Sequence, residues 1–255
     1  MAVDVGNTQT VLGLFDGEEP LGQWRIATEV DRTADELAVF FAGLLALEGL
    51  SLDEITAVIS SSVVPGLTRS YRNLASGVFG VPFYNVTAEM ETGLDNRYDD
   101  PEAVGADRIV NAVAAGRHYG FPAIIVDIGT ATTVEAVDGE GRYLGGAILT
   151  GLYVSLEALV ERTAKLPSVD LEERPPRVIA TNTPDSIRSG FIYGYAGAID
   201  ALIRRSRDEL GEHNVNVIAT GGPAGVIVPY CREIQHFDPD LTLKGLLAIY
   251  GMNAK

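Results

Sequence analysis

A short motif occurs twice in this chain, and the repeat limits the folds that are possible. Asp4-Val5-Gly6-Asn7-Thr8 ends an apolar segment near the N-terminus, and Asp127-Ile128-Gly129-Thr130 ends a second apolar segment about half the chain length later. In both copies an Asp ends the segment, Gly follows two residues on, and an amide or hydroxyl side chain comes next. Two related copies of one unit are the simplest explanation of such a repeat. The sequence therefore predicts a duplicated fold with two lobes.

The segments around the two motifs alternate between strand and helix patterns. Residues 2–5 and 11–15 are apolar on either side of a polar turn, which predicts a hairpin, and residues 33–48 have apolar side chains at helical spacing. A strand at 57–60, helices at 67–77 and 108–118, and strands at 123–126 and 215–219 continue the alternation. The predicted fold class is α/β, with mixed sheets and flanking helices in an N-terminal lobe, residues 1–119, and a C-terminal lobe, residues 120–255.

Composition excludes several classes of function. The formal net charge of -16 argues against a nucleic-acid-binding surface, which needs clustered Lys and Arg side chains. The sequence contains no apolar run near the ~20 residues of a membrane span and no signal peptide pattern, so we expect a cytoplasmic protein without a membrane partner. No lysine follows a glycine-rich loop, which excludes a P-loop.

The first motif has the groups that a phosphate site needs. Gly6 lets backbone N–H groups approach an anion, Asn7 and Thr8 offer neutral donors, and Asp4 can hold a hydrated divalent cation. An ordinary hairpin turn explains either copy alone equally well. The two copies together, followed by Thr220-Gly221-Gly222 after another apolar segment, favour nucleotide binding.

Asp107 and Arg108 begin a helical segment and allow two interpretations each. A carboxylate at Asp107 could accept the proton of an alcohol during phosphoryl transfer, or it could cap the helix. The guanidinium of Arg108 could bind a substrate carboxylate or pair with an acidic neighbour. The residue pattern alone leaves both pairs of alternatives open.

The whole chain resembles the type III pantothenate kinases. The motifs that carry the resemblance are the two repeats, Ser61-Ser62-Val63-Val64-Pro65, Tyr98-Asp99-Asp100-Pro101, Gly105-Ala106-Asp107-Arg108, Gly145-Gly146-Ala147-Ile148, Asn182-Thr183 and Thr220-Gly221-Gly222. These kinases belong to the superfamily of acetate and sugar kinases, heat-shock chaperones and actin, in which two ribonuclease-H-like lobes bind ATP. The resemblance implies phosphorylation of pantothenate by ATP, the first step of coenzyme A synthesis.

The same resemblance implies roles for individual residues. It makes Asp107 the proton acceptor and Asp127 the residue beside a monovalent cation, K⁺ or NH₄⁺. It implies that ATP, with its Mg²⁺, is bound by Asp4, Val5, Gly6, Asn7, Thr8, Gln9, Thr10, Val11 and Thr130. It implies that pantothenate is bound by Tyr98, Gly105, Ala106, Asp107, Arg108 and Thr183. Family members are dimers, so a homodimer is expected.

Thr150-Gly151 departs from the family pattern, which commonly has Pro-Gly there; we expect a more mobile or differently hydrogen-bonded loop. Two other functions compete with the leading one. A related kinase with a different small acceptor would share the nucleotide motifs, although Gly105 to Arg108 argue against it. A regulatory homologue could bind nucleotide without turnover, although the acidic residues Asp4, Asp107 and Asp127 are all present.

Overall fold

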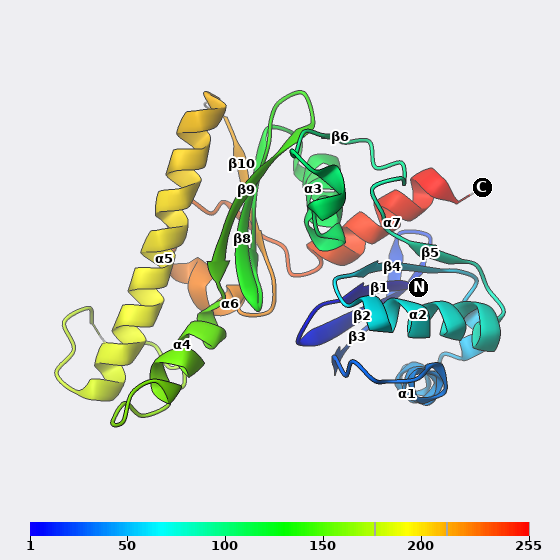
Figure 1. The fold of residues 1–255 in the computed structure, drawn as a ribbon, viewed down its shortest axis with the longest axis horizontal. Helices are drawn as coiled ribbons and strands as arrows, with labels where there is room; N and C mark the ends of the chain where they lie inside the picture. The colour runs from blue at the N-terminus through cyan, green and yellow to red at the C-terminus, as the bar shows by residue number, and fades with distance from the viewer. Residues whose placement is uncertain (176, 213, 255) are drawn as a thin grey trace. The chain divides into compact units, whose positions relative to one another are not determined.

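The structure is a computed structural model that describes residues 1–175, 177–212 and 214–254, and it divides into two compact units. The first unit comprises Met1–Gly93, Asp99–Arg117 and the segment from Leu241 onward. The second comprises Leu94–Tyr98 and His118–Asp240. Figure 1 shows the elements of both units along the chain.

The first unit is built on a five-stranded mixed sheet with the order β3-β2-β1-β4-β5. Strand β1 pairs with β2 in antiparallel and with β4 in parallel orientation. The strands are β1 Ala2–Val5, β2 Gln9–Asp16, β3 Glu19–Ala27, β4 Val58–Ser62 and β5 Phe83–Asn85. The hairpin and the following strand predicted from the sequence are thus confirmed.

Local signals determine where the helices of the first unit begin. Thr33 caps α1 through a capping box with Glu36, and α1 buries Leu37, Phe41 and Leu45 against the sheet core. Pro65 opens α2, where the missing N–H of proline has no cost. The helical elements are α1 Ala34–Leu47, η1 Leu52–Glu54, α2 Pro65–Asn73, the π-helix η2 Leu74–Phe79, η3 Pro101–Ala103, α3 Ala106–Tyr119 and α7 Leu241–Asn253.

The second unit has a six-stranded sheet with the order β11-β10-β7-β8-β9-β6. Its strands are β6 Asp95–Asn96, β7 Ala123–Ile128, β8 Ala131–Val137, β9 Arg142–Thr150, β10 Asn216–Thr220 and β11 His236–Phe237. Its helices are α4 Leu152–Glu161, α5 Thr183–Leu210, α6 Ala224–Ile227 and η4 Val228–Tyr230. The long helix α5, yellow in Figure 1, buries Ile192, Ile199 and Ile203 in the core that also contains the apolar side chains of β7 and β10.

Strand order shows that the fold is duplicated. In each sheet a central strand, β1 or β7, pairs with the next strand in antiparallel orientation and with a later strand, β4 or β10, in parallel. The two-lobed α/β fold predicted from the repeated motif is therefore confirmed. The division at residues 119 and 120 remains a prediction, and the compact units differ from it because α7 packs on β1 and β4 of the first unit.

The described part of the chain contains no helix that is both long enough and apolar enough to cross a membrane.

Candidate nucleotide and substrate site

The turn between β1 and β2 is exposed and held by hydroxyl groups. Asn7, Thr8 and Gln9 are exposed, and the Gly6 N–H donates to the Gln9 carbonyl at 3.1 Å. The Thr28 hydroxyl donates to the Gly6 carbonyl at 2.8 Å and lies 3.0 Å from the Thr10 hydroxyl. The side chains at the tip of the turn are thus exposed to ligands while the base of the turn is fixed.

Asp4 lies at the base of this turn, beside a serine of the parallel neighbour strand. The Ser61 hydroxyl donates to Asp4 Oδ1 at 2.6 Å, because the β1–β4 register places the two residues opposite each other. Burial raises the pKa of the Asp4 carboxyl to about 6. The hydrogen bond from Ser61 opposes this rise, as does the positive charge of Arg25 to a smaller extent, whereas the negative charge of Asp107 adds to it. A carboxylate whose charge is disfavoured in this way gains stability when a cation binds beside it.

Asp107 lies in the first turn of α3 and belongs to the same compact unit as Asp4. Its Oδ1 accepts a hydrogen bond from the Arg108 N–H at 2.9 Å. Because Asp107 is the second residue of α3, this bond lies within the first helical turn, whereas an N-cap side chain accepts from an N–H two or three residues further on. A Cβ at Gly105 would lie 2.5 Å from the same oxygen, so the glycine leaves room for the carboxylate. The electrostatic effect of Asp107 on Asp4 brings the predicted base and the predicted cation ligand into one acidic site within the first unit.

The turn between β7 and β8 is closed in by two glycines. The Gly129 N–H donates to the Ala131 carbonyl at 2.9 Å, and the Gly151 N–H donates to the Thr130 carbonyl at 3.0 Å. A Cβ at Gly151 would lie 2.3 Å from the Thr130 oxygen, and one at Gly221 would lie 2.7 Å from Asp127 Oδ1. Gly221 also has a φ of +99°, which side chains rarely allow. Only glycine fits at either position.

The remaining predicted residues lie in separate parts of the second unit. Thr130 is exposed in the β7–β8 turn, and Asp127 lies near the end of β7, opposite Thr220 of β10. Thr183 is the first residue of α5, which is capped by Asn182. Tyr98 follows β6, beside Tyr143 and Gly145 of β9. Sequence reasoning therefore grouped residues that the structure assigns to two units, and within the first unit the charge of Asp107 acts on Asp4.

Several residues of these turns were not assigned a role from the sequence. Ser61 and Thr28 were missed because their contacts depend on strand register, which the sequence pattern does not give. The positions of Gly151 and Gly221 next to the second turn likewise depend on tertiary contacts. A usable signal for Ser61 was its location at the end of a buried strand, because the ends of parallel neighbours meet at one edge of a sheet.

The donor set suits a magnesium ion that arrives with ATP. The described residues contain no group of three or more His, Cys, Asp or Glu side chains that could enclose a metal ion. A Mg²⁺ ion bound with a nucleotide needs no such group, because it usually keeps several waters and binds one or two carboxylates together with substrate phosphates. Asp4, with its raised pKa, fits the part of such a carboxylate.

The duplicated sheet order and the two Asp-bearing turns define the class of this protein: it has the actin-like ATPase fold. Two solved structures share this fold. A protein from Campylobacter jejuni assigned to the Baf family of transcriptional activators has a TM-score of 0.62 and 18% identity, over 99% of this chain and 98% of its own. The ROK hexokinase from Thermus thermophilus has a TM-score of 0.50 and 14% identity, over 97% and 96%.

Sequence comparison then defines the family. The pattern of the type III pantothenate kinase family matches residues 1–205. The type III pantothenate kinase of Rubrobacter xylanophilus is 66% identical over 100% of this chain and 98% of its own length. The chain belongs to the type III pantothenate kinase family, and it is a kinase.

Proposed function

We propose that this protein transfers the γ-phosphoryl group of ATP to the hydroxyl group of pantothenate, with Asp107 as the proton acceptor. The observation that carries the proposal is the match to a type III pantothenate kinase over the whole chain. Phosphopantothenate then enters coenzyme A synthesis. A cytoplasmic location, expected from the lack of a long apolar run and of a signal-peptide pattern, fits the use of ATP.

The proposed reaction is an in-line displacement at the γ-phosphorus. The pantothenate hydroxyl oxygen forms the new P–O bond, the bond between the γ-phosphorus and the bridging oxygen breaks, and ADP leaves with the electron pair. The hydroxyl proton passes to the Asp107 carboxylate. Asp4 would hold the Mg²⁺ ion that arrives with ATP, and the ion would supply stabilisation of the negative charge on the transferred group. The exposed β1–β2 turn, with donors on Asn7 and Thr8, would bind the phosphates from the first unit.

The substitution Asp107→Asn tests the role of Asp107. Asn has nearly the shape of Asp and keeps an oxygen that can accept the Arg108 N–H, so the folded protein should persist, while kcat should fall by about 10² to 10⁴ because a general base is lost. Affinity for ATP should change little. The measurement is kcat, nucleotide affinity and melting temperature on one preparation. A variant with normal kcat would remove Asp107 from the mechanism, and ADP release that requires another small alcohol in place of pantothenate would favour a different kinase.

The cofactor proposal extends to a monovalent cation, K⁺ or NH₄⁺, beside Asp127. Its support is the correspondence between Asp127 and Asp4, since each lies on the central strand of its sheet opposite a hydroxyl residue of the parallel strand. Activity should be higher in a potassium salt than in a tetraalkylammonium salt at matched ionic strength. Asp127→Asn should reduce that difference. Equal activity in both salts in the unmodified protein would contradict the proposal.

A homodimer is the proposed oligomeric state. Its support is a groove of about 510 Å³ in the second unit, formed by α4 and α5 and lined by Leu159, Leu166, Phe191 and neighbouring residues. Exposed glycines of α5, Gly190 and Gly194, would allow a second helix to approach closely. Light scattering should give twice the chain mass, and Leu159→Glu should lower it. Val39→Glu on the exposed face of α1 is the control.

The sequence pattern also allowed a regulatory protein without turnover, but the family match over the whole chain favours the kinase. The structural likeness to a Baf-family protein is at the level of fold alone. An ADP-release assay with and without pantothenate separates the candidates, because a regulator would release no ADP in either case.

A further inference from the structure

A buried carboxylate in the second unit belongs to none of the roles described above. Glu135 of β8 is only 1% exposed, and the hydroxyl of the fully buried Tyr143 donates a hydrogen bond to its Oε2. Burying a carboxylate is costly unless polar partners compensate, and an apolar pair of similar size would usually be no less stable. The pair therefore suggests a role beyond stability.

Tyr143 connects this pair to the segment that contains Tyr98. Its backbone carbonyl accepts a hydrogen bond from the Arg97 N–H at 2.9 Å, and it lies opposite Asn96 in the β6–β9 register. The ring centroids of Tyr143 and Tyr98 are 6.4 Å apart, with 44° between the ring planes. Tyr143 thus contacts the Tyr98 segment through both its backbone and its ring, and its hydroxyl group binds Glu135.

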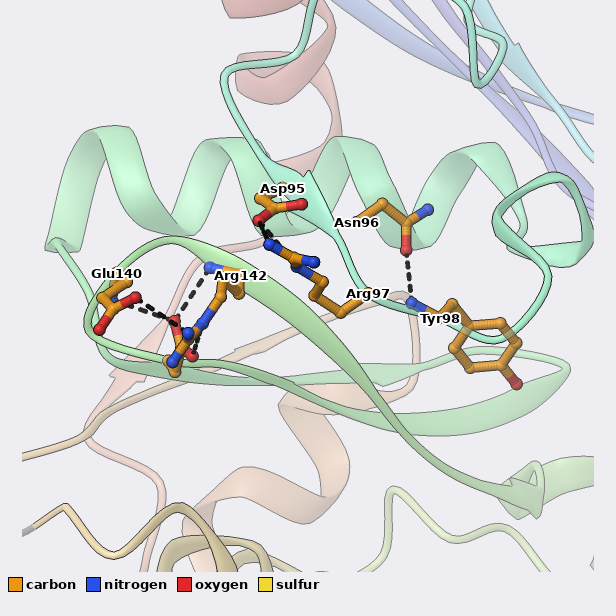
Figure 2. A network of polar contacts seen from close by, with 7 residues as sticks. Asp95, Asn96, Arg97, Tyr98, Glu140 and Arg142 are labelled. Carbon is orange, nitrogen blue, oxygen red and sulfur yellow. Dashed lines mark hydrogen bonds and ion pairs between the residues drawn. The ribbon is translucent and has the colours of Figure 1, made fainter.

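A glycine makes room for the Tyr98 ring. Gly145 has a φ of +110°, and a Cβ there would lie 3.0 Å from Cε2 and 3.1 Å from Cδ2 of the ring. The Tyr98 N–H also donates to Asn96 Oδ1 at 3.1 Å, as Figure 2 shows. Backbone, neighbouring ring and a glycine surface together restrict the orientation of Tyr98.

We propose that Glu135 and Tyr143 are positioning residues that hold the Tyr98 ring in the orientation in which it contacts pantothenate. The inference rests on the proposed function, in which Tyr98 lines the acceptor pocket. The hydrogen bond to Glu135 fixes the Tyr143 ring, and the Tyr143 ring and Gly145 form the surface on which Tyr98 packs. Loss of the bond should therefore weaken pantothenate binding without changing the phosphoryl-transfer step.

Tyr143→Phe is the first test. It removes the hydroxyl donor and should raise KM for pantothenate about tenfold, the effect of one hydrogen bond, with kcat and KM for ATP within about twofold of the unmodified protein. Glu135→Gln keeps an acceptor carbonyl and should raise KM less. Tyr119→Phe is the matched control, because it removes a tyrosine hydroxyl that donates to Asp238 at 2.9 Å elsewhere in the same unit.

A double substitution separates positioning from a general structural effect. In a Tyr98→Ala background, Tyr143→Phe should no longer change KM for pantothenate, since the residue through which it acts is gone. An equal rise in KM in both backgrounds, or no rise in either, would overturn the proposal. If Tyr143→Phe does not fold, Glu135→Gln, measured in the same two backgrounds, decides between the same outcomes. Failure of the unmodified protein to phosphorylate pantothenate would instead overturn the proposed function.

Discussion

The two Asp-bearing turns occupy corresponding positions in the duplicated fold but are held in different ways. The β1–β2 turn is tied by hydroxyl groups, with Thr28 donating to the Gly6 carbonyl and Ser61 donating to Asp4. The β7–β8 turn is enclosed by backbone, with Gly151 and Gly221 so close that neither can carry a side chain. Two turns with the same sequence pattern are thus held by different kinds of contact.

The difference indicates a division of tasks between the turns. Hydroxyl hydrogen bonds can rotate and exchange partners, so the first turn can adjust as phosphates and a metal ion arrive. Close backbone packing changes only with movement of a whole strand or loop, so the second turn presents Thr130 and Asp127 in a fixed geometry. The predictions below test this contrast.

The largest expected effect is the loss of activity on replacing the first Asp. Asp4→Asn removes a negative charge proposed to bind Mg²⁺ and should lower kcat/KM by about 10³, because a metal ion stabilises transition-state charge by several kcal/mol. Asp127→Asn should cost less and should alter the cation dependence. An ADP-release assay measures both. Asp16→Asn, at the exposed end of β2, is the control, and equal losses in the two Asp variants would break the contrast.

A smaller but still large effect is expected on stability in the enclosed turn. Gly151→Ala places a Cβ 2.3 Å from backbone oxygens and should lower the free energy of unfolding by about 3 kcal/mol. Gly6→Ala, with its nearest atom at 2.9 Å, should cost about 1 kcal/mol. Urea unfolding measures both. In Gly43→Ala, on the exposed face of α1, the new methyl meets nothing within 4 Å, so this helical control should not destabilise.

The pH dependence of stability should report the burial of Asp4. The folded pKa of Asp4 is about 6 and the reference value is 3.8, so between these pH values the folded state binds more protons than the unfolded state. Stability from this group therefore falls as pH rises from about 4 to 6 and is constant above. The difference should be on the order of 3 kcal/mol. Asp4→Asn should remove it, and melting temperatures without nucleotide across this range measure it.

The smallest expected effect concerns the hydroxyl beside Asp4. Ser61→Ala removes a hydrogen bond that favours the charged carboxylate, so the pKa of Asp4 should rise further. Affinity for Mg²⁺ and ATP should fall up to about tenfold near pH 6 and less at pH 8, where the carboxyl is ionised in both proteins. Ser60→Ala, which removes a buried hydroxyl that donates to Asn85, is the control. An unchanged pH profile would show that Ser61 does not tune Asp4.

Local sequence patterns predicted much of the fold. Residues 33–48 were expected to form a helix, and α1 runs from Ala34 to Leu47 with Thr33 as its cap, because capping and apolar spacing act within a few residues. The two hairpins were predicted for the same reason. The predicted helix at 67–77 instead begins at Pro65 and continues as a π-helix from Leu74, a change of hydrogen-bond pattern without a sequence signal.

Contacts between distant segments could not be predicted in this way. The bond between Ser61 and Asp4 depends on the parallel register of β1 and β4, and a shift of one residue would point Ser61 to the other face. The position of Tyr98 against Gly145 depends on pairing between β6 and β9, whose sequences are far apart. The sequence placed Asp107 at the start of a helix, but only the structure shows that it is the second helical residue, and its role as proton acceptor is a question for kinetics.

Helix α7 has a consequence for how the protein is made. It packs on β1 and β4, buries Leu241, Leu246 and Ile249, and approaches α3 so closely that a Cβ at Gly245 would lie 2.1 Å from the Val110 carbonyl. Translation produces every strand of the second unit before it produces this helix. The sheet of the first unit, although its strands are synthesised first, therefore keeps an uncovered apolar surface until residues 241–253 have been made.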